Sequence, residues 1–243
     1  MPHFFVDSKN KVNDIISIND AENYRHIARA LRARVGESLL LIDENQIQYE
    51  TKIESITSNV ILCKVENSYP SKRDLDFDLY LAQSPLRSDA QLMIMEKATE
   101  LGVRGVYPVI TDNCALNKSV LEKKHEKWQK VMFEASKQCE RAIIPTCFEP
   151  TTLNKVLEKD FDKILVMAER STEISFKHYL RKNPIKIGEK ILVIIGPEGG
   201  FSEKEFEYFR AKNLPLISLG DLILKAETAV IVALGDIVYE FEG

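Results

Sequence analysis

The sequence predicts an α/β protein in which a small, mainly β domain precedes a larger domain with a mostly parallel sheet. In the larger part, apolar runs without polar alternation are each followed by a helical pattern, which is typical of a parallel sheet covered on both faces. In the smaller part, short apolar strands alternate with polar turns. A polar, proline-containing segment, SYPSKRD at 68–74, predicts a linker. We therefore place the domains at residues 1–70 and 75–243.

Each domain has its own series of elements. In the first, the pattern predicts strands at 39–42, 51–53 and 60–65, with a helix at 24–34. In the second, strands and helices alternate to the end of the chain. The expected strands are 78–83, 105–110, 163–168, 190–195 and 215–219, and the expected helices are 88–101, 119–140, 173–181, 203–212 and a last one to about 239. That last helix contains AVIVAL at 229–234 and is apolar all round, so we expect it to be buried on more than one side.

The composition is that of an ordinary globular protein, with 44% hydrophobic and 29% charged residues. No apolar run is long enough to span a bilayer, and MPHFFVDSKNK at the start lacks the pattern of a signal peptide. The four cysteines form no CxxC pair and the four histidines are scattered, so we expect reduced thiols, no metal and a cytoplasmic protein. The net charge of −4 argues weakly against nucleic-acid binding, but local charge matters more.

A glycine-rich turn follows the apolar strand at 190–195. The segment GPEGG at 196–200 leads into Ser202 and Glu205, which are spaced as a capping box. The turn lacks both GxGxxG and GK[ST], so it is neither a dinucleotide fingerprint nor a P-loop. Its glycines allow a ligand to approach the backbone at the carboxyl end of a strand, where open α/β sheets bind ligands. A plain strand-to-helix loop is the alternative.

A second segment, SLGDLILKAETA at 218–229, also follows a strand. It places Lys225, Glu227 and Thr228, which are residues of exposed type, inside an otherwise apolar stretch. The alternative is a core helix whose first turn is polar, where Glu227 suits the helix dipole.

An acid-free stretch at 23–36 contains four arginines and one histidine. On a helix, Arg25, Arg29 and Arg32 fall within about 60° of one another, which suits RNA phosphates. A solvated helix face is the alternative, and the missing counter-charges favour RNA.

Five segments together carry a family resemblance. IGPEGGFSEKE and SLGDLILKAETA resemble the paired signature of the SPOUT-class RNA methyltransferases. Within that class the chain resembles the 16S rRNA uracil-N3 methyltransferase family. Three further segments are similar in the same order, namely HIARALRARVGESLLLID at 26–43, EKATELGV at 96–103 and KWQKVMFEASKQCER at 127–141. The resemblance therefore spans most of the chain.

The resemblance implies a trefoil-knotted methyltransferase domain that binds S-adenosylmethionine, an N-terminal PUA-like β-barrel domain and a homodimer. The partner it implies is 16S rRNA or the small ribosomal subunit. It assigns cofactor binding to the two glycine-containing loops, at Ile195, Gly196, Glu198, Gly199, Gly200, Leu219, Gly220, Leu224 and Thr228. Three residues depart from the family pattern, because Lys225, His3 and Asn113 stand where arginine is common.

Methylation of uracil N3 requires loss of its proton and a cation that stabilises the resulting anion. We assign the cation to Lys225, and Glu227 orients it or takes the proton. Arg87 and Asp89 open a predicted helix near the carboxyl edge of the sheet, and we expect Arg87 to bind RNA. Two alternatives remain, namely another SPOUT-class methyltransferase, acting on a ribose 2′-hydroxyl or another base, and a non-catalytic RNA-binding protein.

Overall fold

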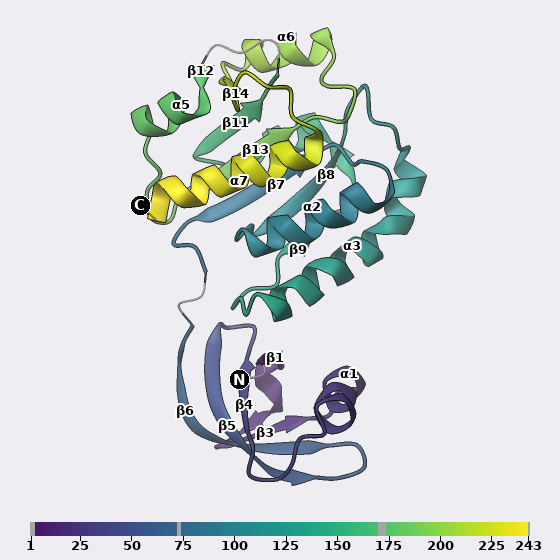
Figure 1. The fold of residues 1–243 in the computed structure, drawn as a ribbon, viewed down its shortest axis with the longest axis vertical. Helices are drawn as coiled ribbons and strands as arrows, with labels where there is room; N and C mark the ends of the chain where they lie inside the picture. Colours follow the sequence, from purple (N-terminus) through teal and green to yellow (C-terminus); the bar gives the residue numbers. More distant parts are fainter. Residues whose placement is uncertain (1–2, 72–73, 170–173, 243) are drawn as a thin grey trace. The chain divides into compact units, whose positions relative to one another are not determined.

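The computed structural model describes residues 3–71, 74–169 and 174–242 (Figure 1). The chain divides into two compact units. One comprises Met1–Asp74 with Lys137–Ile143, and the other comprises Leu75–Ser136 with Ile144–Gly243. The segment 137–143 thus groups with the first unit, although the sequence pattern places it in the second domain.

The first unit contains a six-stranded sheet with the order β1-β4-β5-β6-β3-β2. Only the β1–β4 pair is parallel, and the other pairs are antiparallel. The strands are β1 (His3–Phe5), β2 (Lys11–Val12), β3 (Ile15–Ile18), β4 (Ser38–Ile42), β5 (Ile47–Ile56) and β6 (Ile61–Pro70). A short 3-10 helix, η1 (Ser8–Asn10), lies between β1 and β2. The mainly β character of this unit agrees with the sequence prediction.

Two boundaries in this unit differ from the prediction. β6 continues to Pro70, so the first residues of the expected linker belong to a strand paired with β5. In place of the expected helix at 24–34, the structure has α1 (Ala21–Tyr24), followed directly by a π-helical turn, η2 (Arg25–Ala30). The helical segment therefore begins and ends earlier than expected. Asp20 caps α1 by accepting a hydrogen bond from Asn23 N at 2.8 Å. Arg32 has a φ of 52°, which places it outside the helix.

The second unit is built on an eight-stranded sheet in which every pair is parallel. The order is β10-β8-β7-β13-β11-β14-β12, and β9 also pairs with β8. Its strands are β7 (Asp78–Gln83), β8 (Gly105–Ile110), β9 (Thr146–Cys147), β10 (Thr151–Thr152), β11 (Lys163–Met167), β12 (Ile174–Ser175), β13 (Lys190–Ile195) and β14 (Leu216–Ser218). The five predicted strands are therefore present, and β9, β10 and β12 are short additions. The knot stays a prediction.

In the part of this unit that the structure describes, six helices accompany these strands, and a helix follows each of the long strands except β11, after which β12 comes first. They are α2 (Ser88–Glu100), α3 (Lys118–Gln138), α4 (Leu153–Leu157), α5 (Phe176–Lys182), α6 (Glu203–Ala211) and α7 (Ala226–Glu242). The predicted helix at 173–181 begins at Phe176 in the structure, and position 173 lies outside the described residues.

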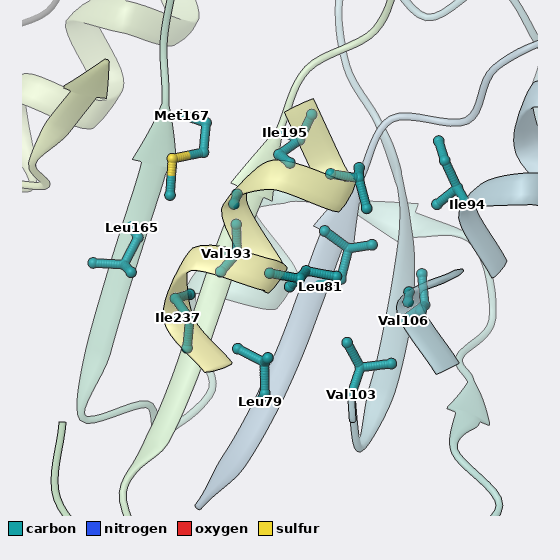
Figure 2. Packing of buried hydrophobic residues seen from close by; sticks show 14 of the residues in the cluster. Leu79, Leu81, Ile94, Val103, Val106, Leu165, Met167, Val193, Ile195 and Ile237 are labelled. Atoms are coloured by element: carbon teal, nitrogen blue, oxygen red, sulfur yellow. The ribbon is translucent and has the colours of Figure 1, made fainter. Parts of the chain in front are cut away.

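Alternate residues of the central strands enter two different cores. Val193 and Ile195 pack in a cluster with Leu81 and with Ile237 of α7, as Figure 2 shows. Ile194 packs in a second cluster with residues of α4 and α6. Helices therefore cover both faces of the sheet, as the unbroken apolar strands predict.

Helix α7 buries only one of its faces. Val230, Ala233, Leu234 and Ile237 are buried, at the spacing of one helix face. Ile231 and Val232 are half-buried, and Tyr239 is 78% exposed. The expectation of burial on more than one side is wrong within one chain, and an apolar face of α7 is partly open.

Candidate functional site

A pocket of about 620 Å³ lies where β11, β13 and β14 end. Three loops, one after each of these strands, supply its walls. The first is 167–169, the second is 195–201 and the third runs from Ser218 into the start of α7. Since these strands are neighbours in the parallel sheet, their carboxyl ends bring the three loops to one edge.

The turn after β13 has a backbone that requires glycine. Gly200 has a φ of +70°, in the left-handed region that favours glycine. A side chain on Gly196 would begin 3.2 Å from the Phe201 ring, so the turn also packs closely on itself. Ser202 then starts α6 with a complete capping box, in which Glu205 N donates to Ser202 Oγ at 3.2 Å.

The loop after β8 braces this turn from outside the pocket. Asn113 Nδ2 donates to Gly200 O at 3.1 Å and to Gly199 O at 3.4 Å. Ser202 Oγ donates to Asp112 Oδ2 at 2.6 Å, and Asp112 N donates to Glu205 Oε1 at 3.1 Å. The sequence reasoning missed Asp112 and noted Asn113 only as a departure from the family pattern, because nothing in the sequence pairs this loop with the glycine turn.

The third loop is shaped by its own backbone. Ser218 Oγ donates to Gly220 O at 2.8 Å, and Gly220 has a φ of +133°. Leu222 is 81% exposed and Ile223 is 63% exposed, so this wall of the pocket is apolar and open to solvent within one chain.

The structure brings most of the predicted site residues together. Ten of them line the pocket, namely Ile195, Gly196, Glu198, Gly199, Gly200, Leu219, Gly220, Leu224, Lys225 and Glu227. Thr228 is exposed and does not line it. The sequence reasoning missed the wall made by Met167, Ala168 and Glu169. Their signal was their place at the end of a predicted strand, but the strand order that puts β11 beside β13 is not readable from the sequence.

The four predicted RNA-binding arginines lie outside this pocket and are exposed. Arg87 is the N-cap residue of α2, as predicted. The geometry predicted for the other three is wrong, since Arg25 and Arg29 lie on the π-helical turn and Arg32 follows it. Arg25 Nε donates to Ala21 O at 3.1 Å. Among the residues that the structure describes, Arg25, Arg29 and Arg32 form no ion pair with a carboxylate, so their charges face solvent.

The pocket suits the cofactor that the resemblance implies. Its volume is within the range of about 300–1,000 Å³ common for small-molecule sites. Gly199 and Gly200 present bare backbone, and a Cβ on either would lie in ordinary van der Waals contact, 3.4–3.6 Å from neighbouring side-chain atoms. Three carboxylates, on Glu169, Glu198 and Glu227, line it with one lysine, which favours a cationic ligand such as a sulfonium.

Comparison with known proteins agrees with this architecture. A family model described as an RNA methyltransferase domain matches residues 73–238, and a model described as an RNA methyltransferase PUA domain matches residues 18–66. The chain belongs to this RNA methyltransferase family. The PUA match also agrees with the predicted character of the first unit.

Relatives match this RNA methyltransferase over nearly all of its length. Ribosomal RNA small subunit methyltransferase E of Bacillus subtilis is 27% identical, over 100% of this chain and 98% of the relative. The protein of the same name from Aquifex aeolicus is 28% identical, over 94% and 96%. A solved Legionella pneumophila methyltransferase with bound SAM has a TM-score of 0.83 at 26% identity, over 97% of this chain and 96% of the other.

Three further findings concern the residues that the structure describes. Over 3–71, 74–169 and 174–242, no helix has the length and apolarity needed to cross a membrane. In the same ranges, no three His, Cys, Asp or Glu side chains are grouped to hold a metal ion. None of the four cysteines forms a disulfide bond, and burial raises the pKa of Cys63 to about 11 and that of Cys147 to about 12.

Proposed function

We propose that this chain transfers a methyl group from S-adenosylmethionine to N3 of a uridine in 16S rRNA. The observation that supports it most is the meeting of two glycine-containing loops, 196–200 and 218–227, at one pocket with Lys225 on its wall. The names of the relatives support small-subunit rRNA as the substrate. The SAM-bound Legionella pneumophila structure supports the cofactor. An rRNA substrate supports a cytoplasmic location for the protein.

We assign different contacts with the cofactor to different residues of the pocket. Gly199 and Gly200 let the cofactor approach the backbone of the turn closely, because they carry no side chains of their own. Apolar side chains of Leu219 and Leu224 exclude water from the opposite wall. Glu198 and Glu169 provide negative charge near a cation. When bound, S-adenosylmethionine supplies an activated methyl group.

The chain's own catalytic contribution is control of charge on the uracil. Lys225 is exposed and directly precedes α7, whose first intrahelical bond runs from Ala229 N to Lys225 O at 2.8 Å. Its ammonium can therefore extend from a fixed backbone toward O2 or O4 of a uracil at the pocket and stabilise the imide anion. Glu227, two residues further along the chain, lines the same pocket and can orient Lys225 or take the N3 proton.

We assign RNA binding to the exposed arginines. Arg25, Arg29 and Arg32 present solvent-facing charge on the PUA-like unit, and Arg87 presents it at the start of α2. Phosphate contacts of this kind fix the position of an RNA and do not read its sequence. They are consistent with a substrate that is recognised on a folded rRNA or an assembled subunit.

We assign a homodimer to the open face of α7. At 100° per residue, Val232 and Tyr239 fall on the side opposite the buried face, and Ile231 and Val238 lie between the two sides. Leu222 and Ile223 add exposed apolar surface beside the pocket. A two-fold interface between identical copies is the commonest way to cover such a surface.

The experiment that tests this function is methyl transfer to small-subunit rRNA with labelled S-adenosylmethionine. Incorporation of label into the rRNA supports a methyltransferase, and its absence with both naked rRNA and assembled subunits supports the non-catalytic alternative. A transferase that modifies a ribose 2′-hydroxyl or another base is separated from the proposed one by the identity of the product.

A further inference from the structure

We propose that a small cleft between α2 and α3 binds a backbone phosphate of the substrate RNA. The proposal rests on the function proposed above and extends it to a second contact on the methyltransferase unit. The cleft has a volume of about 170 Å³ and is lined by Asp89 and Gln91 of α2 and by Lys124, Lys127 and Trp128 of α3. Figure 1 shows both helices in the second unit.

Gln91 is a buried amide whose donor nitrogen is unpaired within the described residues. Its side chain lines the cleft and is only 1% exposed. The oxygen, Oε1, accepts a hydrogen bond from Leu86 N at 2.8 Å, which fixes the orientation of the amide. The nitrogen, Nε2, has no hydrogen-bond partner among the described residues. Buried donors are normally paired, so we infer that a bound ligand supplies the acceptor atom for this nitrogen.

The lining of the cleft also carries a net positive charge. Lys124 and Lys127 lie one turn apart on α3, and neither forms an ion pair within the described parts of the chain. Asp89 is the single carboxylate of the lining, so the side chains leave one positive charge. At this end of α2, Arg87 is an extended N-cap residue whose side chain makes no capping hydrogen bond. The cleft thus combines cationic side chains with an uncapped helix N-terminus, both of which favour an anion.

Size and position indicate which anion. The volume is below the range of about 300–1,000 Å³ that holds whole small molecules, and a phosphodiester group offers acceptors without donors. The loop that leads to α2 is tied to the carboxyl edge of the sheet. Ser84 N donates to Ile195 O at 3.1 Å, and Ser84 Oγ lies 2.7 Å from Thr111 Oγ1. Because Ile195 also lines the cofactor pocket, the loop that leads to the cleft starts at the same edge of the sheet as that pocket, where we expect the RNA to bind.

The first test compares two double variants of α3. Lys124→Ala with Lys127→Ala removes both cleft lysines, whereas Lys123→Ala with Lys130→Ala removes the same charge from exposed positions outside the cleft. For the cleft variant we expect a several-fold higher KM for rRNA with an unchanged kcat and unchanged affinity for S-adenosylhomocysteine. The slope of log Kd against log salt should fall by about one. Equal effects of the two variants would overturn the proposal.

The second test addresses Gln91 and the source of the phosphate. Gln91→Glu keeps the acceptor for Leu86 N and replaces the donor with oxygen, so it should also raise KM. A thermal melt with S-adenosylhomocysteine verifies that this variant folds. If it does not fold, the double variant Lys124→Ala with Lys127→Ala tests the proposal by itself.

RNA fragments with single neutral methylphosphonate linkages then identify the contact. One linkage should weaken binding to the native protein and have no effect on the cleft variant. If no linkage does so while inorganic phosphate stabilises the native protein more than the cleft variant, the cleft binds free phosphate and the proposal is wrong. If the native protein transfers no methyl group to rRNA, the proposed function itself is wrong.

Discussion

Asn113 Nδ2 donates a hydrogen bond to Gly200 O at 3.1 Å and so holds the glycine turn of the cofactor pocket from the neighbouring loop. The same amide also reaches Gly199 O at 3.4 Å. Asn113 is therefore a positioning residue, whose effect on the reaction passes through the shape of the turn.

Replacing Asn113 with Ala should weaken cofactor binding. One neutral hydrogen bond contributes about 0.5–1.5 kcal/mol, so we expect about a two- to tenfold higher Kd for S-adenosylhomocysteine. Isothermal titration calorimetry measures it. Asn117→Ala is the control, since the Asn117 side chain accepts from Val120 N at 3.1 Å at the start of α3 and does not line the pocket. Unchanged affinity of the Asn113 variant would show that the brace is dispensable.

Gly200→Ala should separate backbone strain from ligand binding when it is compared with Gly188→Ala. Both glycines have positive φ, +70° and +80°, so alanine should lower the free energy of unfolding by about 1–2 kcal/mol at either site. Only Gly200 lines the pocket. Thermal melts should therefore show a smaller shift with S-adenosylhomocysteine for Gly200→Ala alone. Equal shifts in both variants would place the cofactor elsewhere.

Replacing Arg25, Arg29 and Arg32 with Ala should weaken RNA binding and leave cofactor binding intact. Each lost phosphate contact on single-stranded RNA lowers the salt slope by about 0.7. Filter binding of an rRNA fragment at several salt concentrations measures this. The matched control replaces Lys9, Lys52 and Lys64 on the same unit. If both triple variants bind RNA as tightly as the native protein, the arginines form only a solvated face.

The open face of α7 predicts a dimer at micromolar concentration. Tyr239→Glu places a charge on the 78% exposed position of this face and should produce a monomer, whereas Glu240→Ala beside it should not. Light scattering measures the mass of each. A monomeric native protein would contradict the assignment.

Features that depend on interactions between residues close in sequence could be predicted, and features that depend on contacts between distant segments could not. The strand at 190–195 and the capping box at Ser202 were predictable, because unbroken apolar runs and capping residues act locally. Helix η2 was mispredicted because a helical pattern continues beyond Ala30, while the backbone turns at Arg32 with a φ of 52°.

The site was predictable only in part, since its walls come from distant segments. The two glycine loops carry local signals and a family resemblance, and both line the pocket. Glu169 and the brace at Asn113 depend on strand order and loop contacts, which a single sequence does not encode in any local pattern.

Lys225 is expected to act mainly in the transition state. Lys225→Met removes the cation and should reduce kcat by about 10²–10³ with little change in cofactor affinity, because the charge on the uracil forms only during the reaction. Lys225→Arg keeps the charge and should retain substantial activity. Single-turnover assays and calorimetry separate the two quantities. A Lys225→Met enzyme with native kcat would remove Lys225 from the mechanism.

Nucleoside mass spectrometry of small-subunit rRNA, taken from cells lacking this protein and then reacted with it, tests the central claim most directly. The imide anion of uracil is delocalised, and the fixed charge of Lys225 at the pocket suits it better than a ribose alkoxide. We predict that N3-methyluridine appears after reaction with the native enzyme and falls sharply with Lys225→Met. A 2′-O-methylated nucleoside without N3-methyluridine would contradict the proposed function.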